Sequence, residues 1–351
     1  MYLVVEPTQP LNRTNHSMTS ANEFIIIYGG YDDWSWISYF ELWTYNTISD
    51  IWRRYKPPSE TLNGCILSSI CAVGNLVYIF GGKHYRDLRQ LSNSLHSFNI
   101  RKGTWKILSP HIDDYGINTP PPLYGSSICH HDGCLYILGG VCNDDIFQSV
   151  YKFCLMTSTW SLVHQNGLLP LLGHRVLGTV FKNQFYTFGY SGRDAPNRFK
   201  FINIFNFSTN TWTPEKQTRK TQLYPDSDRI QESFSFSNTC GYLSGGKNST
   251  RYYSDIWKID LETLEWFKLK YNLNICMFFH CTAVVNDCFL YTYGGDGHYS
   301  HYRNSLERFT VQPPTLYRLC IEYIRRSLNL MTCAKILPTS ILNDLNLGSD
   351  S

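Results

Sequence analysis

Long apolar runs are absent from this 351-residue sequence, and none approaches the roughly 20 residues that a membrane helix needs. The opening segment, MYLVVEPTQP, has no basic leader and only a short apolar stretch before Glu6, so we expect no signal peptide. The 12 cysteines show neither a close CxxC pair nor a metal-ligand spacing with histidine, which favours free thiols over disulfides or a metal site. These absences predict a protein of the cytosol or nucleus that uses no membrane, metal or cofactor.

Charge and catalytic patterns are also scarce. Only 17% of the residues are charged, and the net charge of +3 is too small to predict a nucleic-acid partner, whose binders concentrate Lys and Arg in one patch. Neither a close pair of acids nor a Ser-His-Asp arrangement is evident, so we do not expect an enzyme. Aromatic residues, by contrast, make up 15% of the chain, with 25 Tyr and 20 Phe, and these residues favour β-strands.

The chain consists of similar units, each marked by an apolar run that ends in a glycine pair or, once, in Gly-Tyr. The runs are FIIIYGG, LVYIFGG, CLYILGG, QFYTFGY, CGYLSGG and FLYTYGG, and their last residues are 52, 58, 50, 56 and 49 positions apart. In the first five units an alternating strand, a polar turn and a tryptophan follow; the tryptophans are Trp52, Trp105, Trp160, Trp212 and Trp266. A period near 50 with four short strands predicts an all-β, six-bladed β-propeller.

Each recurring feature has a structural role in such a propeller. The apolar runs would be strands buried between neighbouring blades, and the glycines would allow a positive φ or a close approach at the strand end. The tryptophans would fill the gaps between blades. Because the sixth unit lacks its tryptophan strand, we expect the N-terminal MYLVVE to supply the outer strand of blade six, which closes the ring and removes its exposed edges. The propeller would span residues 1–312.

Strand openings and the loops after the glycine pairs are expected on one face, around the axis. The side chains predicted there are aromatic and cationic, with few acids. Arginine suits bidentate capture of a carboxylate, so the face would fit an anionic peptide end, although each arginine could instead pair with an aspartate or lie solvated. The candidates are Arg175, Arg193, Arg229, Tyr124, Phe279, His280 and Trp34.

The segment PPTLYRLCIEYIRR, residues 313–326, breaks the β pattern and predicts a helix, since proline is tolerated at a helix start. Its apolar stripe consists of Leu316, Leu319, Cys320, Tyr323 and Ile324. The opposite, polar face carries Arg318, Glu322, Arg325 and Arg326. A closed propeller has already buried its own apolar surface, so the stripe either lies across the rim or binds another protein.

The repeat resembles the kelch family in its glycine pairs and spaced tryptophans, over residues 1–312, with departures at Gly189-Tyr190 and at the missing sixth tryptophan. The tail is similar to two known boxes. TLYRLCIEYI has the spacing of the elongin-binding box, with Thr315, Leu316, Cys320 and Ile324. LPTSILNDL resembles a cullin 2 box, with Leu337, Pro338, Ile341 and Leu345. Ser340 stands where a cullin 5 box would add a second proline.

Two such boxes after a propeller are similar to the kelch-repeat substrate receptors of cullin–RING ubiquitin ligases. The resemblance implies that the propeller binds C-terminal peptides, especially those ending in glycine, and that the tail, residues 313–351, recruits elongin B/C and cullin 2 with its RING protein. Arg175 and Arg229 carry over by position as carboxylate ligands, whereas Asn63 and Pro122 stand where arginine is expected. The alternative is a kelch interaction scaffold in signalling or the cytoskeleton, with its tail packed on the rim.

Overall fold

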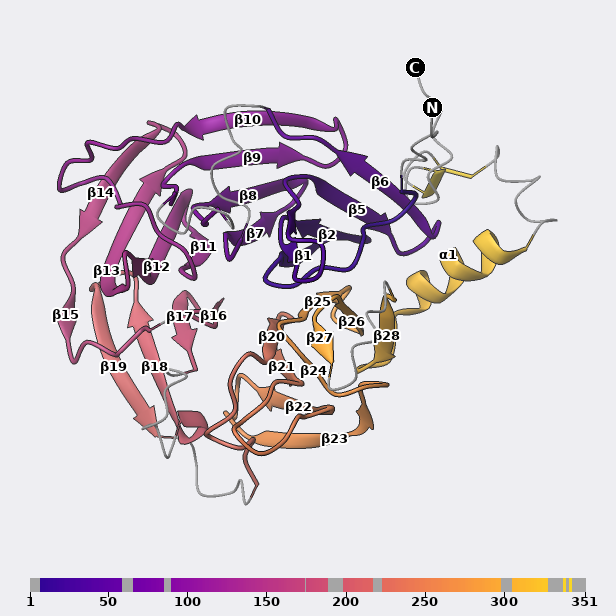
Figure 1. Ribbon diagram of the computed structural model, residues 1–351. Helices are drawn as coiled ribbons and strands as arrows, with labels where there is room; N and C mark the ends of the chain where they lie inside the picture. The colour runs from indigo at the N-terminus through magenta and orange to yellow at the C-terminus, as the bar shows by residue number, and fades with distance from the viewer. Residues whose placement is uncertain are drawn as a thin grey trace.

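The computed structural model describes residues 7–58, 66–84, 90–173, 175–188, 198–216, 223–297, 305–327, 337–338 and 341–342. Six sheets, antiparallel except for one short parallel pair in blade four, surround one axis, and the chain passes through them in order (Figure 1). The first strand of each sheet lies innermost. The predicted six-bladed propeller with one C-terminal helix is confirmed.

The strands of the first three blades follow the expected order in the sequence. Blade one contains β1 (Ser17–Ala21), β2 (Phe24–Tyr28), β5 (Leu42–Asn46) and β6 (Ile51–Tyr55). Blade two contains β7 (Ser69–Val73), β8 (Leu76–Phe80), β9 (Leu95–Asn99) and β10 (Thr104–Ser109). Blade three contains β11 (Ser127–His131), β12 (Cys134–Cys142), β13 (Asp145–Cys154) and β14 (Thr159–Val163).

The second half of the ring is less regular. Blade four contains β16 (Gly178–Phe181), β17 (Gln184–Thr187), β18 (Phe201–Asn206) and β19 (Thr211–Lys216), with η2 (Arg198–Lys200) before β18 and β15 (Asn166–Gly167) parallel to β19. Blade five contains β20 (Ser233–Phe236), β21 (Cys240–Ser244), β22 (Asp255–Asp260) and β23 (Trp266–Asn272). The described part of blade six contains β25 (Cys281–Val285), β26 (Phe289–Tyr293) and β28 (Glu307–Thr310). The remaining elements are the small hairpins β3 (Tyr31–Asp32) with β4 (Ile37–Ser38) and β24 (Met277–Phe278) with β27 (Asp296–Gly297), and helix α1 (Leu316–Arg326).

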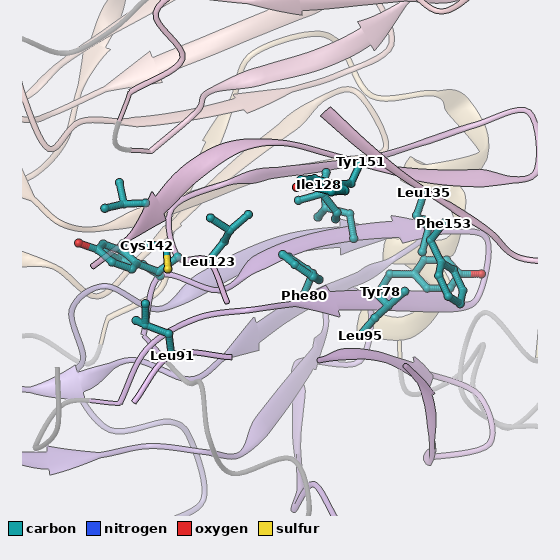
Figure 2. Close-up of a cluster of buried hydrophobic side chains, with 14 of the residues drawn as sticks. Tyr78, Phe80, Leu91, Leu95, Leu123, Ile128, Leu135, Cys142, Tyr151 and Phe153 are labelled. Carbon is teal, nitrogen blue, oxygen red and sulfur yellow. The ribbon is translucent and has the colours of Figure 1, made fainter. Parts of the chain in front are cut away.

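Apolar side chains pack between neighbouring blades. Figure 2 shows the cluster between blades two and three, where Phe80 and Leu95 face Leu123 and Phe153. Gly81 permits this approach, because its φ is +67° and a Cβ there would lie 2.3 Å from the carbonyl oxygen of Leu123. The glycine pairs therefore have the structural role that their spacing predicted.

Tryptophans of the fourth strands also fill the gaps between blades, as expected. Trp160 of blade three has its ring centroid 5.7 Å from that of Phe80 in blade two, and its Nε1 donates to Ser109 Oγ at 3.0 Å. Trp52 of blade one lies 6.0 Å from Tyr293 of blade six. Trp52 therefore packs across the junction where the ring closes.

Blades one and six meet directly. The thiol of Cys281, at the start of β25, donates to the carbonyl oxygen of His16 at 3.0 Å, and the amide of Gly295 donates to the carbonyl oxygen of Arg13 at 2.9 Å. The predicted closing strand, residues 1–6, lies outside the described residues.

The cysteines of the described part of the chain form no disulfide. Ten of them lie there, and each is a free thiol. No three His, Cys, Asp or Glu side chains of the described residues gather so as to hold a metal ion. Within the same segments, no helix has the length and apolarity needed to cross a membrane.

Candidate functional site

A polar cavity of about 190 Å³ lies on the propeller axis, lined by the first strands of all six blades and the residues just before them. Hydroxyl groups link neighbouring blades along its wall. Ser69 Oγ donates to the carbonyl oxygen of Ser126 at 2.7 Å, and Ser233 Oγ lies 2.8 Å from Thr282 Oγ1. Because these hydroxyls can both donate and accept, the wall can solvate a polar ligand.

One residue per blade, just before the first strand, has a positive φ of 51° to 68°. These six residues, which we call the axial ring, are Asn15, Leu67, Gly125, Arg175, Gln231 and Phe279. Backbone hydrogen bonds join them from blade to blade: the amide of Leu67 donates to Asn15 O at 3.0 Å, and that of Gly125 donates to Leu67 O at 2.8 Å. Five of the six are not glycine, although L-residues enter this conformation at a cost, so their backbones are held by the closed ring.

Arg175 is the one charged side chain among the described residues that line the cavity. It is half-buried, and its Nη1 atom is buried with no hydrogen-bond partner among the described residues. Burying a guanidinium nitrogen without an acceptor is unfavourable, because the lost hydration is not replaced. A bound anion would supply the missing acceptor.

Two buried histidines, His16 and His280, lie near Arg175. His16 lines the cavity, is only 2% exposed, and has no hydrogen-bond partner for either ring nitrogen within the described segments. Burial, followed by the charges of Arg13 and other nearby cationic groups, lowers its pKa well below the usual value. The pKa of His280 is lowered to about 3 by burial and then by the charge of Arg175. Both rings are therefore neutral near pH 7.

Two acids at the blade openings and blade strands are already paired with other arginines. Glu232 forms a buried ion pair with Arg198 of blade four, and although burial opposes it, the charge of Arg198 and then that of Arg175 hold its pKa below the usual value. Glu41 is paired with Arg13, with Nη2 and Oε1 at 3.0 Å. Since these pairs are neutral overall, Arg175 gives the cavity a local positive charge.

Helix α1 forms a second candidate surface, at the edge of blades one and six beside β6 and β28 (Figure 1). Thr315 caps it, since its Oγ1 accepts from the amide of Arg318 at 3.2 Å. The predicted apolar stripe points outward: Leu316 is 77% exposed, and Cys320 and Tyr323 are also exposed. An apolar groove of about 550 Å³ runs along this stripe, lined by Leu319, Cys320, Glu322, Tyr323, Ile324 and Arg326.

The model of the KLHDC2/KLHL20/DRC7 Kelch-repeats domain matches residues 2–114 and 68–295 of the chain. This chain belongs to the kelch-repeat family. Its kelch relatives include Kelch domain-containing protein 10 from rat and from human, each 24% identical over 329 residues, which is 89% of this chain and 79% and 73% of the respective relatives. The protein of the same name from Xenopus laevis is 23% identical over 357 residues, or 97% of this chain and 85% of the relative.

Arg229 was predicted to bind a ligand carboxylate, but its side chain is bonded within blade five. Its side chain is fully buried, and Nη1 donates to Asp255 Oδ1 at 2.8 Å while Nη2 donates to Asp255 Oδ2 at 3.1 Å. Nη1 also donates to the carbonyl oxygen of Gly245 at 2.9 Å. The guanidinium is therefore committed to the protein, which corrects the prediction that Arg229 holds a ligand carboxylate.

Of the other residues predicted on the binding face of the propeller, only Phe279 belongs to the axial ring with Arg175. His280 and Tyr124 are buried behind the lining; His280 Nε2 lies 2.9 Å from Ser244 Oγ, and Lys83 Nζ lies 4.4 Å from the ring centroid of Tyr124. Trp34 is 66% exposed in the loop of the β3–β4 hairpin. Arg193 lies outside the described residues. Arg175 lines the cavity, and so does His16, another strand-opening residue that the sequence places on this face.

The described residues of the C-terminal tail match the predicted arrangement only in part. Ile324 is half-buried and packs with Leu337 and Ile341 against a small cluster of Ile48 and Ile321. Pro338 is exposed, and Leu345 lies outside the described residues. Arg318, which was predicted on the solvent face, is buried against the propeller. The helix therefore packs through Arg318 and Ile321, and leaves the stripe of Leu316 and Cys320 uncovered by the described residues.

Proposed function

We propose that this kelch-repeat protein is a substrate-recognition subunit of a cullin 2–elongin B/C RING ubiquitin ligase, which binds C-terminal peptides, especially those ending in glycine, in the axial cavity. The observation that carries the proposal is the buried, unpartnered Nη1 of Arg175 at a polar cavity on the axis, with no partner among the described residues. A peptide carboxylate is an anion of suitable size, and a charge-assisted pair with arginine is among the stronger hydrogen bonds.

A preference for a small final residue follows from the crowding of the cavity. Six strands converge on about 190 Å³, and the lining includes apolar side chains such as Leu67 and Phe234. A carboxylate held by Arg175 would leave little space for a side chain on the last residue. Glycine has none, so it would fit with the smallest loss of packing.

The exposed stripe of helix α1 supports the second half of the proposal. Leu316 and Cys320 occupy the elongin-box positions, and both are exposed. An apolar stripe on a water-exposed helix is costly unless a partner covers it, and binding of such a helix in a groove is a common mode of recognition. Elongin B/C would cover the stripe, and cullin 2 would bind at Leu337, Pro338, Ile341 and Leu345. The RING protein and its E2 would transfer ubiquitin, so this chain would supply binding and geometry.

Recruitment is tested by co-purification with elongin B/C and cullin 2. The wild-type chain should retain both, and Leu316→Ala combined with Cys320→Ala should abolish elongin binding without unfolding the propeller, because both side chains are exposed. The matched control is Met156→Ala, which truncates an apolar side chain that is 92% exposed on blade three. Failure of the wild type to bind elongin, or undiminished binding by the double variant, would refute the proposal.

Carboxylate capture is tested by titrating a glycine-ended peptide as the free acid and as the amide. Arg175→Ala should weaken the acid by about 2 to 5 kcal/mol, as for a buried charge-assisted pair, and should change the amide much less. Arg251→Ala is the control, since it removes an exposed arginine from the same face, where it pairs with Asp226. Equal losses for acid and amide would contradict the role of Arg175.

A kelch interaction scaffold is the second candidate, and one observation favours it. Arg318 and Ile321 pack against the propeller, as a tail held on the rim would require. This function predicts that the wild-type chain recruits no elongin and that proteases spare its tail. The two candidates are therefore separated by the same co-purification.

A further inference from the structure

The guanidinium of Arg318 attaches helix α1 to the propeller through hydrogen bonds. It is 4% exposed, and its Nη2 donates to the carbonyl oxygen of Thr47 at 2.9 Å and to Thr47 Oγ1 at 3.0 Å. Nη1 donates to Asn286 Oδ1 at 3.1 Å, and Nε donates to Glu322 Oε1 at 2.9 Å. The guanidinium thus connects the helix with blade one through Thr47 and with blade six through Asn286.

An apolar contact completes this attachment. Ile321 lies one turn along the helix from Arg318, is almost fully buried, and packs with Ile48 in the turn that joins β5 to β6. We call Thr47, Ile48 and Asn286 the helix seat. A hydrogen-bonded, planar guanidinium beside a packed aliphatic pair resists both sliding and rotation of the helix, because the hydrogen bonds are directional and the packing is close.

The turn of the helix seat differs from the same turn in the other blades. The five turns read NTISD, NIRKG, CLMTS, NFSTN and DLETL. At the position of Thr47 the other blades have an apolar residue, namely Ile100, Leu155, Phe207 and Leu261. At the position of Ile48 they have exposed residues, namely Arg101, Met156, Ser208 and Glu262. Blade one reverses this order, so that a hydrogen-bonding residue meets Arg318 and an apolar residue meets Ile321.

The helix seat and the axial ring lie on opposite faces of the propeller. The ring residues precede the first strand of each blade, whereas Thr47 and Asn286 lie in turns after the third strand of blade one and after the first strand of blade six. In an antiparallel blade those turns are at the opposite end from the first-strand openings. A five-residue strand spans about 17 Å, so a peptide in the cavity and a partner on α1 would be separated by at least the thickness of a blade.

We propose that Arg318 is a positioning residue that, with the helix seat, fixes the direction of α1 relative to the propeller. The inference rests on the proposed function. Fixing the helix orients the exposed stripe of Leu316 and Cys320 outward, so that elongin B/C bound there, and the ligase beyond it, lie at a defined place relative to a peptide held by Arg175. Arg318 itself contacts neither the peptide nor the stripe, and acts through the orientation of the helix.

Three variants test this role from both sides of the contact. Arg318→Ala alters the helix, and Ile48→Ser alters the helix seat alone, giving blade one the residue type that blade four has at Ser208. The matched control is Met156→Ser, which introduces the same residue at the same turn position in blade three. We call Arg318→Ala and Ile48→Ser the seat variants, because each removes one side of the contact. In the isolated chain, hydrogen exchange of the α1 amides should accelerate about tenfold in both seat variants and not in Met156→Ser, because loss of tertiary contacts favours local opening. Unchanged exchange in the seat variants overturns the proposal.

The second readout is the position of ubiquitin on a model substrate whose tail ends in glycine and carries lysines at graded distances from it. With wild-type receptor, elongin B/C and cullin 2, modification should concentrate on a narrow range of lysines. The seat variants should bind elongin and the glycine-ended peptide within about twofold of wild type, since neither surface is altered, yet spread ubiquitin over more lysines.

An unchanged lysine pattern in variants that still bind both partners would overturn the positioning role. Absence of elongin binding by the wild type is a different result, because it refutes the proposed function on which the inference rests.

Discussion

In blade five the guanidinium of Arg229 forms a bidentate pair with the carboxylate of Asp255, through hydrogen bonds of 2.8 Å and 3.1 Å. The ring of Tyr253 covers the guanidinium at 3.9 Å, and the carbonyl of Gly245, in the glycine pair, accepts a third bond at 2.9 Å. The arginine thereby ties the opening of its blade to the end of the second strand and the start of the third.

Blade one contains the same arrangement. Arg13 donates to Glu41 Oε1 and to the carbonyl of Gly29, both at 3.0 Å, and lies 4.2 Å from the ring of Tyr39. Two blades thus use an arginine at the same place to bind their own glycine turn and acid. This repetition indicates a structural role for Arg13 and Arg229. Arg175 differs, because no acid of the described residues forms such a pair with it.

Arg229→Ala should therefore reduce the free energy of unfolding by about 3 to 5 kcal/mol, because it removes the bidentate partner of the partly buried carboxylate of Asp255, which then keeps Trp257 Nε1 and Lys268 Nζ. Arg175→Ala, which removes a side chain from a polar cavity, should change stability much less. Urea denaturation of both variants measures the difference. Similar small losses in the two variants would show that the Arg229 pair contributes little.

The propeller could be predicted from the sequence because its markers are residue types with few alternatives. A glycine such as Gly81 and a tryptophan such as Trp160 satisfy geometric needs that other residues meet poorly, and their spacing is regular. The axial ring could not be predicted in the same way. Its positive φ is imposed by hydrogen bonds between blades, and it is occupied by residues as different as Asn15, Leu67 and Phe279.

This difference explains the error over Arg229. Both arginines precede a first strand, but Arg175 occupies the axial ring, whereas Arg229 lies two positions before the ring residue Gln231. The sequence has no signal for that offset. The helix shows a similar limit: its apolar stripe was evident, but a polar side chain such as Arg318 was expected in water, and only the acceptors of the helix seat explain its burial.

Acid should destabilise the propeller. The pKa of His96 is lowered to about 4, and that of His280 to about 3, chiefly by burial, whereas histidine in the unfolded chain titrates near 6.5. Between pH 6.5 and about 4 the unfolded chain binds more protons than the folded one, so the free energy of unfolding falls as the pH falls, by at most about 1.4 kcal/mol per unit for each histidine. Urea titrations at several pH values measure the slope.

His96→Gln should flatten this pH dependence, because it removes one of the groups that become protonated on unfolding. His164→Gln, at an exposed histidine, is the control and should leave the slope unchanged. Stability that stays constant from pH 7 to pH 5 in the wild type would contradict the assignment.

Cys154 should be the thiol that reacts first among those whose pKa is shifted. Hydrogen bonds from the side chain and amide of Thr157 and the amide of Met156 lower its pKa to about 7, whereas burial raises the pKa of Cys281 to about 11. At pH 7.5 iodoacetamide should therefore alkylate Cys154 well before Cys281, since the thiolate is the nucleophile. Peptide mass spectrometry measures both rates. Thr157→Val should shift the pH profile of Cys154 upward, and a wild-type rate that rises only above pH 8 would refute the prediction.

Gly125 should control the proposed peptide site through the backbone of Arg175. Its φ is +68°, and a Cβ there would lie 3.0 Å from the Arg175 amide nitrogen, so Gly125→Ala must displace the arginine. Gly133→Ala is the matched control, because Gly133 has the same φ of +68° and a Cβ added there would meet nothing within 4 Å.

The free energy of unfolding should fall by about 1 kcal/mol or slightly more in both variants, because alanine is strained in the left-handed backbone conformation. Only Gly125→Ala should also weaken a glycine-ended free-acid peptide, by about tenfold in a binding titration, since a displacement below 1 Å is enough to lengthen a charge-assisted hydrogen bond. Equal peptide affinities in the two variants would mean that the position of Arg175 does not set binding.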